Sequence, residues 1–532
     1  MIAPAGGSPL GARAAADDLE ASATSLREIA RRIERSVGPV TVVGPLEVAV
    51  TAVAYDHRRV APASVRPASS PATAATGHRE LSGTVAPSEG ALFCCLVGEH
   101  HDGHDYARTA RANGAVAFVC ERELGEAAES ATQLVVGPGH AREAMAAASC
   151  VLWGDPAEAL TTVGVTGTNG KTTTTVLLGS ILEAAGYRAS VVGTLSSSRT
   201  TPESPELQAS LASARRAASS SGRPGAVALE VTSHGLVQHR ADGFVHDVAV
   251  FTNLSQDHLD YHGTMEAYFE AKATLFTPAH ARRGVVNAGD DYGRRLLDRG
   301  EIALDGFSLT DAVDLEMSAA GSRFRLGGEE VHLRLVGRPN VENALAAAAA
   351  ARALGIDDGL IASGLSAVPA VPGRFEPVPN ALGITAVVDY AHTPAGLARA
   401  CETLRGLLGR GGRLVVVFGA GGDRDREKRP LMAEAVSSQA HVGVLTTDNP
   451  RHERPEAIVE AVRGGWKGSR ELLVEVDRRR AISLALGLVG EGDVLLVAGK
   501  GHETTQQVGD EFLPFDDRIV LAEEAGVLAG RP

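Results

Sequence analysis

The segment GVTGTNGKTTTT, Gly164–Thr175, constrains the fold of this chain more than any other part of it. It lies between an apolar, strand-like run, Thr161–Thr166, and a helix-like run, Thr172–Ala185. Glycines let backbone amides approach phosphate oxygens, a helix N-terminus adds positive potential, Lys171 adds a charge, and the threonine after it can bind Mg²⁺. Val165 stands where the common GxxxxGK[ST] pattern has its first glycine. In its strand–helix context, the segment still predicts a nucleotide phosphate loop rather than a structural glycine turn.

Strands and helices continue to alternate after this loop. Buried-strand candidates lie at 227–231, 248–252 and 284–287, and an alanine-rich helix is expected at 340–354. Pro369, Pro372 and Gly373 mark a boundary, after which short valine-rich runs lie at 384–389, 414–419, 442–446 and 494–498. Such alternation is typical of parallel βαβ units. The sequence therefore predicts an α/β fold with two successive parallel-sheet regions.

Polar or glycine-rich sequence follows each valine-rich run after the boundary. The four segments read DYAHTP, GAGGDRD, TDNPR and GKGHE. Ligands of open α/β sheets bind beyond the carboxyl ends of the strands. We therefore expect these four loops to form one composite site.

The N-terminal region is less regular. The first 35 or so residues are rich in Ala, Arg and Ser and predict a flexible tail leading into a helix. Strand-like runs at 40–43 and 91–97 and a helix-like run at 106–113 predict a small α/β domain that ends near Ala159. A stretch from about 61 to 87 holds Pro, Ala and Ser without apolar periodicity, which is typical of an insertion,.

Composition and charge exclude several classes of protein. The net charge is -14, so the surface as a whole should repel nucleic acid and anionic membranes,. The five cysteines fit neither a zinc site nor a disulfide framework, and we expect buried thiols in a reducing compartment,. The N-terminus lacks a signal-peptide pattern, and no apolar run approaches the roughly 20 residues of a membrane span. A cytoplasmic enzyme without membrane insertion is expected.

Two further polar segments follow predicted strands. In EVTSHGLVQHR, 230–240, the strand-end carboxylate of Glu230 can bind Mg²⁺, although such a glutamate also serves as a cap or an ion-pair partner,. In TNLSQDHLDYHGTMEAYFEAKATLF, 252–276, acidic and histidine side chains cluster around His258, where the alternative is a solvated loop with helix caps. Lys272 lies on the helix that follows, where a lone lysine is usually a surface residue.

These motifs in this order resemble the Mur ligase superfamily. TGTNGKTT, TNLSxDHLDYHG, DYAHTP, GGDRD, DNPR and GKGHE carry the resemblance, which runs from about Val48 to Leu521. The motif set is most similar to members that add diaminopimelate to UDP-N-acetylmuramoyl-L-alanyl-D-glutamate. The resemblance implies a tail at 1–35 and a three-domain architecture: an N-terminal UDP-substrate domain at 36–159, a central P-loop ATPase domain at 160–371, and a Rossmann-like amino-acid-binding domain at 372–532.

The resemblance also implies the nucleotide and metal residues. The ATP-binding set is Gly167, Thr168, Asn169, Gly170, Lys171, Thr172, Thr173, Asn343, Arg374 and Asp389. The catalytic set is Lys171, Glu230, His258 and Lys272. The Mg²⁺ ligands would be Thr172, Glu230, His258 and a carbamylated Lys272. Carbamylation turns a cation into an anion, which would explain a lysine beside a metal ion.

The remaining implied residues bind the other two substrates. The set for the UDP-muramoyl dipeptide is Tyr55, His57, Glu99, His100 and His101 on the uridine side, with Thr200, Thr201, Thr232, Gln238 and Arg240. The set for the incoming amino acid is Arg424, Asp448, Asn449, Pro450, Arg451, Gly499 and Glu503. Arg451 would pair with the distal carboxylate of diaminopimelate and Glu503 with its distal ammonium group. The alternative for Arg451 is a surface ion pair with Glu453.

Several positions depart from the pattern of the superfamily. Thr232 stands where serine is usual, and the hydroxyl is kept. His57 stands where a serine usually helps to hold the uridine end, and the insertion begins a few residues later. Pro339 replaces a common aromatic residue, and Asp290-Asp291 replaces Asp-Pro. The uridine pocket is therefore the place where the resemblance is weakest.

The implied reaction is ATP-dependent ligation of meso-diaminopimelate through an acyl phosphate, with ATP as co-substrate and Mg²⁺ as cofactor. It belongs to peptidoglycan synthesis and so to cell shape and cell division, and a monomer is expected. One alternative is a diverged paralogue that acts on another acid or amine, or a sister such as folylpolyglutamate synthase, although DNPR argues against the sister families. Another is a nucleotide-binding scaffold without catalysis, against which the intact Lys171, Glu230, His258 and Lys272 argue.

Overall fold

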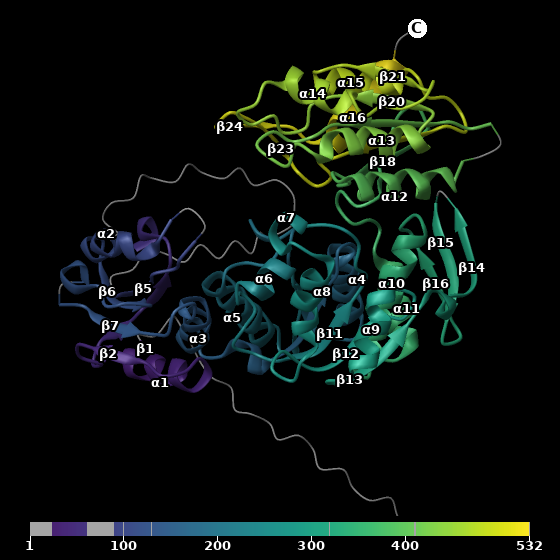
Figure 1. The fold of residues 1–532 in the computed structure, drawn as a ribbon. Coiled ribbons are helices and arrows are strands. Elements are labelled where there is room, and N and C mark those ends of the chain that lie inside the picture. Colours follow the sequence, from purple (N-terminus) through teal and green to yellow (C-terminus); the bar gives the residue numbers. More distant parts are fainter. Residues whose placement is uncertain are drawn as a thin grey trace, which may run out of the picture. The chain divides into compact units, whose positions relative to one another are not determined.

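The computed structural model of the chain describes residues 24–60, 90–98, 101–128, 130–318, 320–408 and 411–530. These residues form two compact units. The first unit extends to Pro156 and also contains Ser204–Ala209, and the second contains the described residues from Ala157 onward apart from that short segment. Figure 1 labels the helices and strands of both units.

A five-stranded sheet forms the centre of the first unit. The strand order is β2 (Thr41–Val43), β7 (Thr132–Val135), β6 (Ala115–Cys120), β5 (Ala91–Cys94) and β4 (Ala52–Ala54). All neighbours are parallel except β2 and β7. The helices are α1 (Leu26–Ser36), α2 (Ala107–Ala112) and α3 (Ala141–Leu152), and β1 (Thr24–Ser25) pairs with β3 (Ala49–Val50). Each face of the sheet carries its own apolar cluster.

Helix α1 corrects the expected flexible tail at 1–35. Ser25 caps the helix, and its apolar residues at spacings of three and four place Leu26, Ile29 and Ile33 on one face,. These three side chains are fully buried, and α1 packs against α3. The core of the first unit therefore already includes α1, which begins at Leu26. The expected insertion at 61–87 and the first 23 residues lie outside the described residues.

The second unit contains two six-stranded sheets, of which the first is entirely parallel. Its order is β13 (Ala303–Phe307), β12 (Ala281–Asn287), β11 (His246–Phe251), β8 (Leu160–Thr166), β10 (Gly225–Glu230) and β9 (Arg188–Val192). The helices along this part of the chain are α4 (Lys171–Ala184), α5 (Ser204–Ser221), α6 (Ser233–Val237), α7 (Leu259–His262), α8 (Met265–Ala273), α9 (Asp291–Arg299), α10 (Arg338–Ala353) and α11 (Asp358–Ala367). Helix α4 packs against α10 and α11 in one large apolar cluster.

A small antiparallel sheet that the sequence did not suggest adjoins α11. It consists of β14 (Val313–Ser318), β15 (Gly321–Leu326) and β16 (Glu329–Leu333). Phe324, Leu326 and Val331 are buried in the same apolar cluster as α4 and α10. The small sheet thus extends the core of the parallel sheet.

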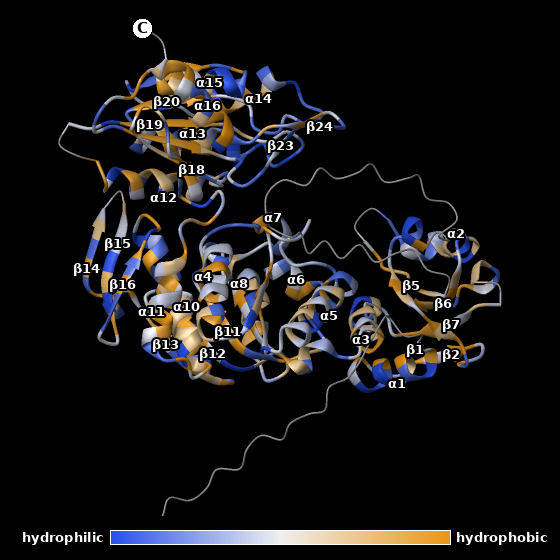
Figure 2. Cartoon of the chain, turned by 180° about the vertical axis from the view of Figure 1, so that it is seen from behind, coloured by the Kyte–Doolittle hydropathy of each residue, from blue (hydrophilic) through white to orange (hydrophobic). Residues whose placement is uncertain are grey.

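The second six-stranded sheet has the order β17 (Glu376–Pro377), β18 (Thr385–Asp389), β22 (Val494–Ala498), β19 (Leu414–Phe418), β20 (Val442–Leu445) and β21 (Glu471–Val474). Only the β17–β18 pair is antiparallel. One face packs on α12 (Pro394–Arg405), α13 (Lys428–Gln439) and α14 (Pro455–Arg463), and the other on α15 (Arg478–Leu486) and α16 (Asp517–Ala529). Figure 2 shows β19 and β20 largely in the orange of hydrophobic residues, as burial on both faces requires,.

The described elements confirm the α/β fold. The strands expected at 161–166, 384–389 and 494–498 are β8, β18 and β22 to within a residue. A hairpin that the sequence did not predict, β23 (Thr505–Val508) with β24 (Glu511–Pro514), follows the GKGHE segment. All five cysteines are buried, as expected. No helix in the described ranges is both long enough and apolar enough to pass through a membrane.

Candidate active site

The phosphate loop lies between the end of β8 and the start of α4, as the sequence predicts. Gly167 and Gly170 have φ angles of 147° and 88°, which favour glycine,. A Cβ on Gly167 would lie 2.0 Å from Thr252 Oγ1, and one on Gly170 would lie 2.2 Å from Asn343 Oδ1. The glycines therefore allow β11 and α10 to approach the loop closely, and they bring the expected ATP residue Asn343 to it.

Two lysines meet at the carbonyl oxygen of Gly167. Lys171 Nζ donates to Gly167 O at 2.8 Å and to Thr168 O at 2.9 Å. Lys272 Nζ, from α8, donates to the same Gly167 O at 2.9 Å. Burial lowers the pKa of Lys171, and burial together with the charge of Lys171 brings the pKa of Lys272 well below its ordinary value. Only 1% of Lys272 is exposed, so the alternative of a surface lysine is wrong.

Glu230 ends β10 close to the start of α4. Its Oε2 accepts from Thr172 Oγ1 at 2.9 Å, and its Oε1 accepts from the backbone N of Thr194 at 2.9 Å. Only 1% of Glu230 is exposed, and no basic side chain of the described residues lies within 4.0 Å of its carboxylate. A buried carboxylate with only neutral donors is suited to a cation. Thr194 was missed because nothing in its local sequence marks a partner of Glu230.

His258 begins α7 with a φ of 53°. Its side chain is 48% exposed, its ring lies 4.8 Å from the ring of His234, and its Nε2 lies 3.5 Å from Asp257 Oδ2. Burial lowers the pKa of His258, and the positive charges of Lys171 and Lys272 act in the same direction. His262 Nε2 lies 2.9 Å from Ser233 Oγ, so this segment is not a purely solvated loop.

These residues place oxygen and imidazole groups beside the phosphate loop. In the described ranges, however, no three His, Cys, Asp or Glu side chains gather as a metal site. Thr172 Oγ1 and Glu230 Oε2 are oxygen atoms of the kind that Mg²⁺ prefers. Unmodified Lys272 would instead repel a cation. The donor set thus fits Mg²⁺ only if Lys272 loses its positive charge.

The residues expected to hold the muramoyl dipeptide are continuous with Glu230. Thr201 Oγ1 donates to Glu230 O at 2.9 Å and lies 3.0 Å from Thr232 Oγ1. Arg240 Nη1 donates to Thr201 O at 3.1 Å, and its Nη2 bonds to Gln238. Thr200 Oγ1 lies 3.0 Å from Thr194 Oγ1, which donates to Glu230 Oε2 at 3.3 Å. One hydrogen-bonded network therefore joins this expected set to the phosphate loop.

Glu203 is a buried acid of this network that the sequence reasoning missed. Its carboxylate pairs with Arg240 Nε at 3.1 Å and also with Arg199. It lies two residues after Thr201, and this short spacing was the only available signal. Arg240 is therefore already held by a carboxylate.

The expected uridine-side residues lie in the first unit. The rings of His57 and Tyr106 stack with centroids 4.7 Å apart, and Tyr106 Oη lies 3.3 Å from His101 Nδ1. Tyr55 Oη donates to Glu206 Oε1 at 2.9 Å. Tyr106 was not predicted, although its aromatic ring joins His57 to His101. Glu99 and His100 lie outside the described residues.

Arg374 and Asp389, also expected at ATP, lie near the start of the second parallel sheet. Asp389 Oδ2 accepts from the backbone N of Phe375 at 2.8 Å. Burial raises the pKa of Asp389, and the nearby Arg374 opposes that shift. The Arg374 guanidinium lies 4.7 Å from the ring centroid of Tyr390. Arg374 and Asp389 are therefore close enough for the charge of Arg374 to act on the Asp389 carboxyl group.

The expected amino-acid residues follow β19, β20 and β22. Asn449 Nδ2 donates to Glu503 Oε2 at 2.8 Å, and a Cβ on Gly499 would lie 2.4 Å from Asp448 Oδ2. Arg451, after the buried Pro450, has a φ of 51°, and its Nη1 donates to Gly422 O at 2.8 Å. The two loops named TDNPR and GKGHE therefore meet, as expected. Arg424 is exposed and takes part in none of these contacts.

The surface ion pair considered for Arg451 is not what forms. Glu453 pairs with Arg429 at 2.7 Å and with Arg426 at 3.2 Å. The backbone of Arg451 is instead bonded to the β23–β24 hairpin, through its N to Gln507 O at 3.1 Å and its O to Gly509 N at 2.8 Å. The hairpin thus fixes the place from which the Arg451 side chain extends.

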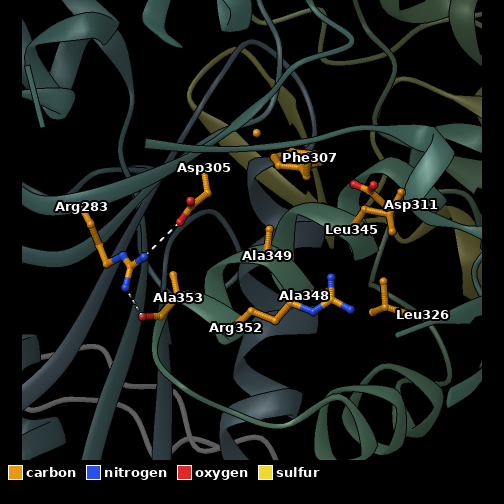
Figure 3. Close-up of a pocket in the computed structure, with 11 residues that line it drawn as sticks. Arg283, Asp305, Phe307, Asp311, Leu326, Leu345, Ala348, Ala349, Arg352 and Ala353 are labelled. Atoms are coloured by element: carbon orange, nitrogen blue, oxygen red, sulfur yellow. Dashed lines mark hydrogen bonds and ion pairs between the residues drawn. The ribbon is translucent and has the colours of Figure 1, made fainter. Parts of the chain in front are cut away.

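A cavity of about 280 Å³ contains none of the expected site residues. It lies between β12, β13, β15 and α10, with Phe307 and Leu345 among its apolar lining residues. Figure 3 shows Arg283 at its side, bonded to Asp305 and to the carbonyl oxygen of Ala353. Arg283 is thus already paired within the protein, and so is Arg352, whose Nε donates to Asp358 Oδ1 at 2.7 Å.

Comparison with known proteins agrees with this architecture. The Mur ligase middle domain matches residues 165–351, the Mur ligase glutamate ligase domain matches 373–501, and the Mur ligase catalytic domain matches 83–150. The parallel sheet with a phosphate loop and the second, mostly parallel sheet agree with these domain matches. The chain belongs to the Mur ligase family.

Individual relatives narrow the comparison. A UDP-N-acetylmuramoyl-L-alanyl-D-glutamate–2,6-diaminopimelate ligase of Geobacter sulfurreducens is 41% identical over 487 residues, which cover 83% of this chain and 93% of the relative. A solved structure with the same protein name is 30% identical, with a TM-score of 0.62, and the match covers 96% of this chain and 100% of that one. The MurF ligase of Thermotoga maritima, solved with ADP, is 21% identical and has a TM-score of 0.56, over 83% of this chain and 94% of that one.

Proposed function

We propose that this chain is an ATP-dependent ligase that adds meso-diaminopimelate to UDP-N-acetylmuramoyl-L-alanyl-D-glutamate in peptidoglycan precursor synthesis. The observation that carries the proposal is the convergence of Lys171, Lys272 and Glu230 at the phosphate loop. The relatives with this activity match most of the chain. The ADP bound to a ligase of the same fold supports ATP as the co-substrate.

The reaction has two steps that need charge stabilisation rather than a protein nucleophile. An oxygen of the D-glutamate γ-carboxylate attacks the γ-phosphorus of ATP, and the bond from that phosphorus to the bridging oxygen breaks to release ADP. The amine of diaminopimelate then attacks the acyl carbon of the acyl phosphate. Phosphate leaves with the bonding electron pair, and the amine loses a proton. Lys171 would face the negative charge that accumulates during phosphoryl transfer.

Thr172, Glu230, His258 and carbamylated Lys272 are the groups that would hold Mg²⁺. The ion would neutralise negative charge between phosphate oxygens. The nearly buried Glu230 carboxylate, which accepts only from neutral groups within the described residues, fits this role. Carbamylation requires an uncharged amine, and the burial of Lys272 beside Lys171 favours that form,. The carbamate would then supply the second anion of the site.

The other residues are proposed to bind the two remaining substrates. Arg240, with Thr201 and Thr232, would receive the dipeptide carboxylate, and Glu203 would hold Arg240 until it arrives. His57 and His101 would contact the uridine end, with Tyr55, Glu99 and His100. Arg451 and Glu503 would select the distal amino-acid centre of diaminopimelate, with Asp448, Asn449, Pro450, Gly499 and Arg424 around them. The domain limits expected from the resemblance, a cytoplasmic location and a monomeric state remain part of this proposal.

Phosphate release with a panel of amino acids tests the function. The purified chain is incubated with ATP, Mg²⁺, the UDP-muramoyl dipeptide and, in turn, meso-diaminopimelate, LL-diaminopimelate, lysine or ornithine. We expect release that depends on the UDP-substrate and is fastest with meso-diaminopimelate. Preference for another acid or amine would favour the diverged paralogue, to which the unusual His57 also points. Nucleotide binding without any release would favour a non-catalytic scaffold.

A further inference from the structure

Lys500, in the GKGHE segment, is fully buried and has three hydrogen-bond acceptors. Its Nζ donates to Asn449 Oδ1 at 3.1 Å, to Glu503 Oε2 at 3.0 Å and to Thr505 O at 2.6 Å. An ammonium group has three N–H donors. All three are therefore used inside the protein, and none remains for a ligand.

The acceptors of Lys500 belong to the two loops that carry the proposed amino-acid pocket. Asn449 Oδ1 also accepts from the backbone N of Gln507 at 2.9 Å, while Asn449 Nδ2 donates to Glu503 Oε2. This pattern fixes the orientation of the Asn449 amide. Glu503 Oε2 thus accepts from both Lys500 and Asn449, so this oxygen is committed within the protein.

The other oxygen of Glu503 is in a different situation. In the described part of the chain no hydrogen bond reaches Glu503 Oε1, and 30% of the Glu503 side chain is exposed. The carboxylate therefore has one anchored oxygen and one that faces outward. Such an arrangement presents a single acceptor in a fixed direction, and this reduces the ordering cost of binding.

A second buried cation nearby has a separate task. Arg478 donates to Thr447 O at 3.1 Å and Ala498 O at 2.9 Å, and pairs with Asp517 at 2.7 Å. It therefore joins the ends of β20 and β22 themselves. No hydrogen bond links Arg478 to Asn449 or Glu503 within the described residues. Arg478 therefore does not orient these two side chains.

We propose that Lys500 is a positioning residue that sets the selectivity of the amino-acid pocket. It would hold Asn449 and Glu503 so that Glu503 Oε1 receives the distal ammonium group of the incoming amino acid. This inference rests on the proposed function. It adds a residue, Lys500, that does not contact the substrate but sets the position of Glu503, which does.

A double-mutant cycle tests the proposal on the full-length enzyme. Lys500→Met, Glu503→Gln and the double variant are compared with wild type for KM of the amino acid, KM of ATP and melting temperature. Lys500→Met should raise KM for the amino acid about tenfold or more, because a charge-assisted bond to Glu503 is lost, and leave KM for ATP within about twofold. In the Glu503→Gln background, Lys500→Met should add less than about twofold. The control is Lys467→Met, an exposed lysine of the same sheet region paired with Glu434, which should change neither KM.

Multiplicative effects of the two substitutions would overturn the proposal, as would an equal rise in the KM values of ATP and the amino acid. If Lys500→Met alone folds poorly, the test is the KM for the amino acid in Glu503→Gln compared with that in the double variant. Neither of these two variants contains the Glu503 carboxylate, so neither leaves that carboxylate without Lys500. Equal KM values there would support the proposal, and a further rise would refute it. The cycle is run with whichever amino acid wild type uses fastest, so failure of the diaminopimelate assignment is seen separately in wild type.

Discussion

Two buried lysines, one at the strand ends of each six-stranded sheet, have opposite surroundings. Lys272 contacts one carbonyl oxygen and lies beside a second lysine, with no acidic partner within 4.0 Å among the described residues. Lys500 has three acceptors, one of them a carboxylate. Burial of a charge is tolerated only with compensation. This difference supports the proposed carbamylation of Lys272 and the proposed positioning role of Lys500.

The first prediction removes Lys171, the lysine beside Lys272. Lys171→Ala should lower kcat by about a hundredfold or more, because the charge that faces the developing phosphoryl transition state is lost. The substitution removes only two bonds to loop carbonyls, so we expect circular dichroism and melting temperature to stay close to wild type. Steady-state phosphate release measures the effect. A folded variant with near-normal release would refute the assignment of the loop.

The second prediction separates the two lysines chemically. Lys272 should carry a carbamate and Lys500 should not, since only Lys272 lacks a carboxylate partner. Chemical trapping of carbamates followed by peptide mass spectrometry should label the Lys272 peptide alone. Lys272→Ala should lose about a hundredfold in kcat. Acetate or propionate should restore part of the activity by replacing the missing anion.

The control for this rescue is Lys171→Ala, which the same carboxylic acids should not restore. A label on both lysine peptides would remove the distinction between the two sites. An unmodified Lys272 side chain turned into solvent in a high-resolution map would exclude the carbamate altogether.

The sequence predicts the positions of some site residues and not of others. The positions of Lys171 and Glu230 were predictable because Lys171 lies in the loop motif after β8 and Glu230 ends β10, and parallel strands bring such ends together,. Those of Thr194 and Glu203 were not, because the partners that join them to the site, Glu230 and Arg240, lie more than 30 residues away in sequence. Lys500 lies next to Gly499 in a recognised motif, yet local sequence does not reveal whether a lysine is buried.

The fold shows the same division between local and distant information. Apolar runs such as Leu414–Phe418 are buried on both faces and were recognised as strands. The β23–β24 hairpin was missed because most of its residues are exposed or half-buried, including Phe512 at 65%. Its importance lies in bonds to Arg451 and Asn449, which only tertiary structure reveals. A helix was expected after the N-terminal tail, but it begins at Leu26, earlier than the predicted tail boundary at residue 35.

The third prediction concerns the pocket that Lys500 supports. Arg451→Ala should raise KM for diaminopimelate about ten- to hundredfold, because the distal carboxylate loses a charge-assisted partner. KM for ATP should stay near normal, and the preference for diaminopimelate over lysine should narrow, since lysine has no such carboxylate. Arg454→Ala, at an exposed arginine in the same loop, is the matched control. Equal losses for ATP and the amino acid would show that this loop does not determine specificity.

A third buried base lies at the other end of the central sheet and has even less compensation than Lys272. His246 begins β11, 1% exposed, and neither ring nitrogen has a hydrogen-bond partner within the described structure. Its ring packs against Gly164 of β8, where a Cβ would lie 2.9 Å from Nε2. Burial, together with the charge of His280, lowers the pKa of His246 from 6.5 to about 3. The folded protein therefore keeps this imidazole neutral.

The last prediction follows from that depressed pKa. Above about pH 6.5 the ring is neutral in both states and adds no pH dependence; below it, the unfolded chain binds a proton that the folded chain does not. His246 should thus lower the free energy of unfolding by about 1.4 kcal/mol for each pH unit from about pH 6 toward pH 3. His246→Leu should remove that part of the slope, while His332→Leu, at an exposed histidine, should not.

Hydrogen exchange of the β8 and β11 amides at about pH 7.5 and pH 5 reports local stability without assuming two-state unfolding. Identical pH dependence in wild type and His246→Leu would mean that the pKa of His246 in the folded protein is close to its value in the unfolded chain.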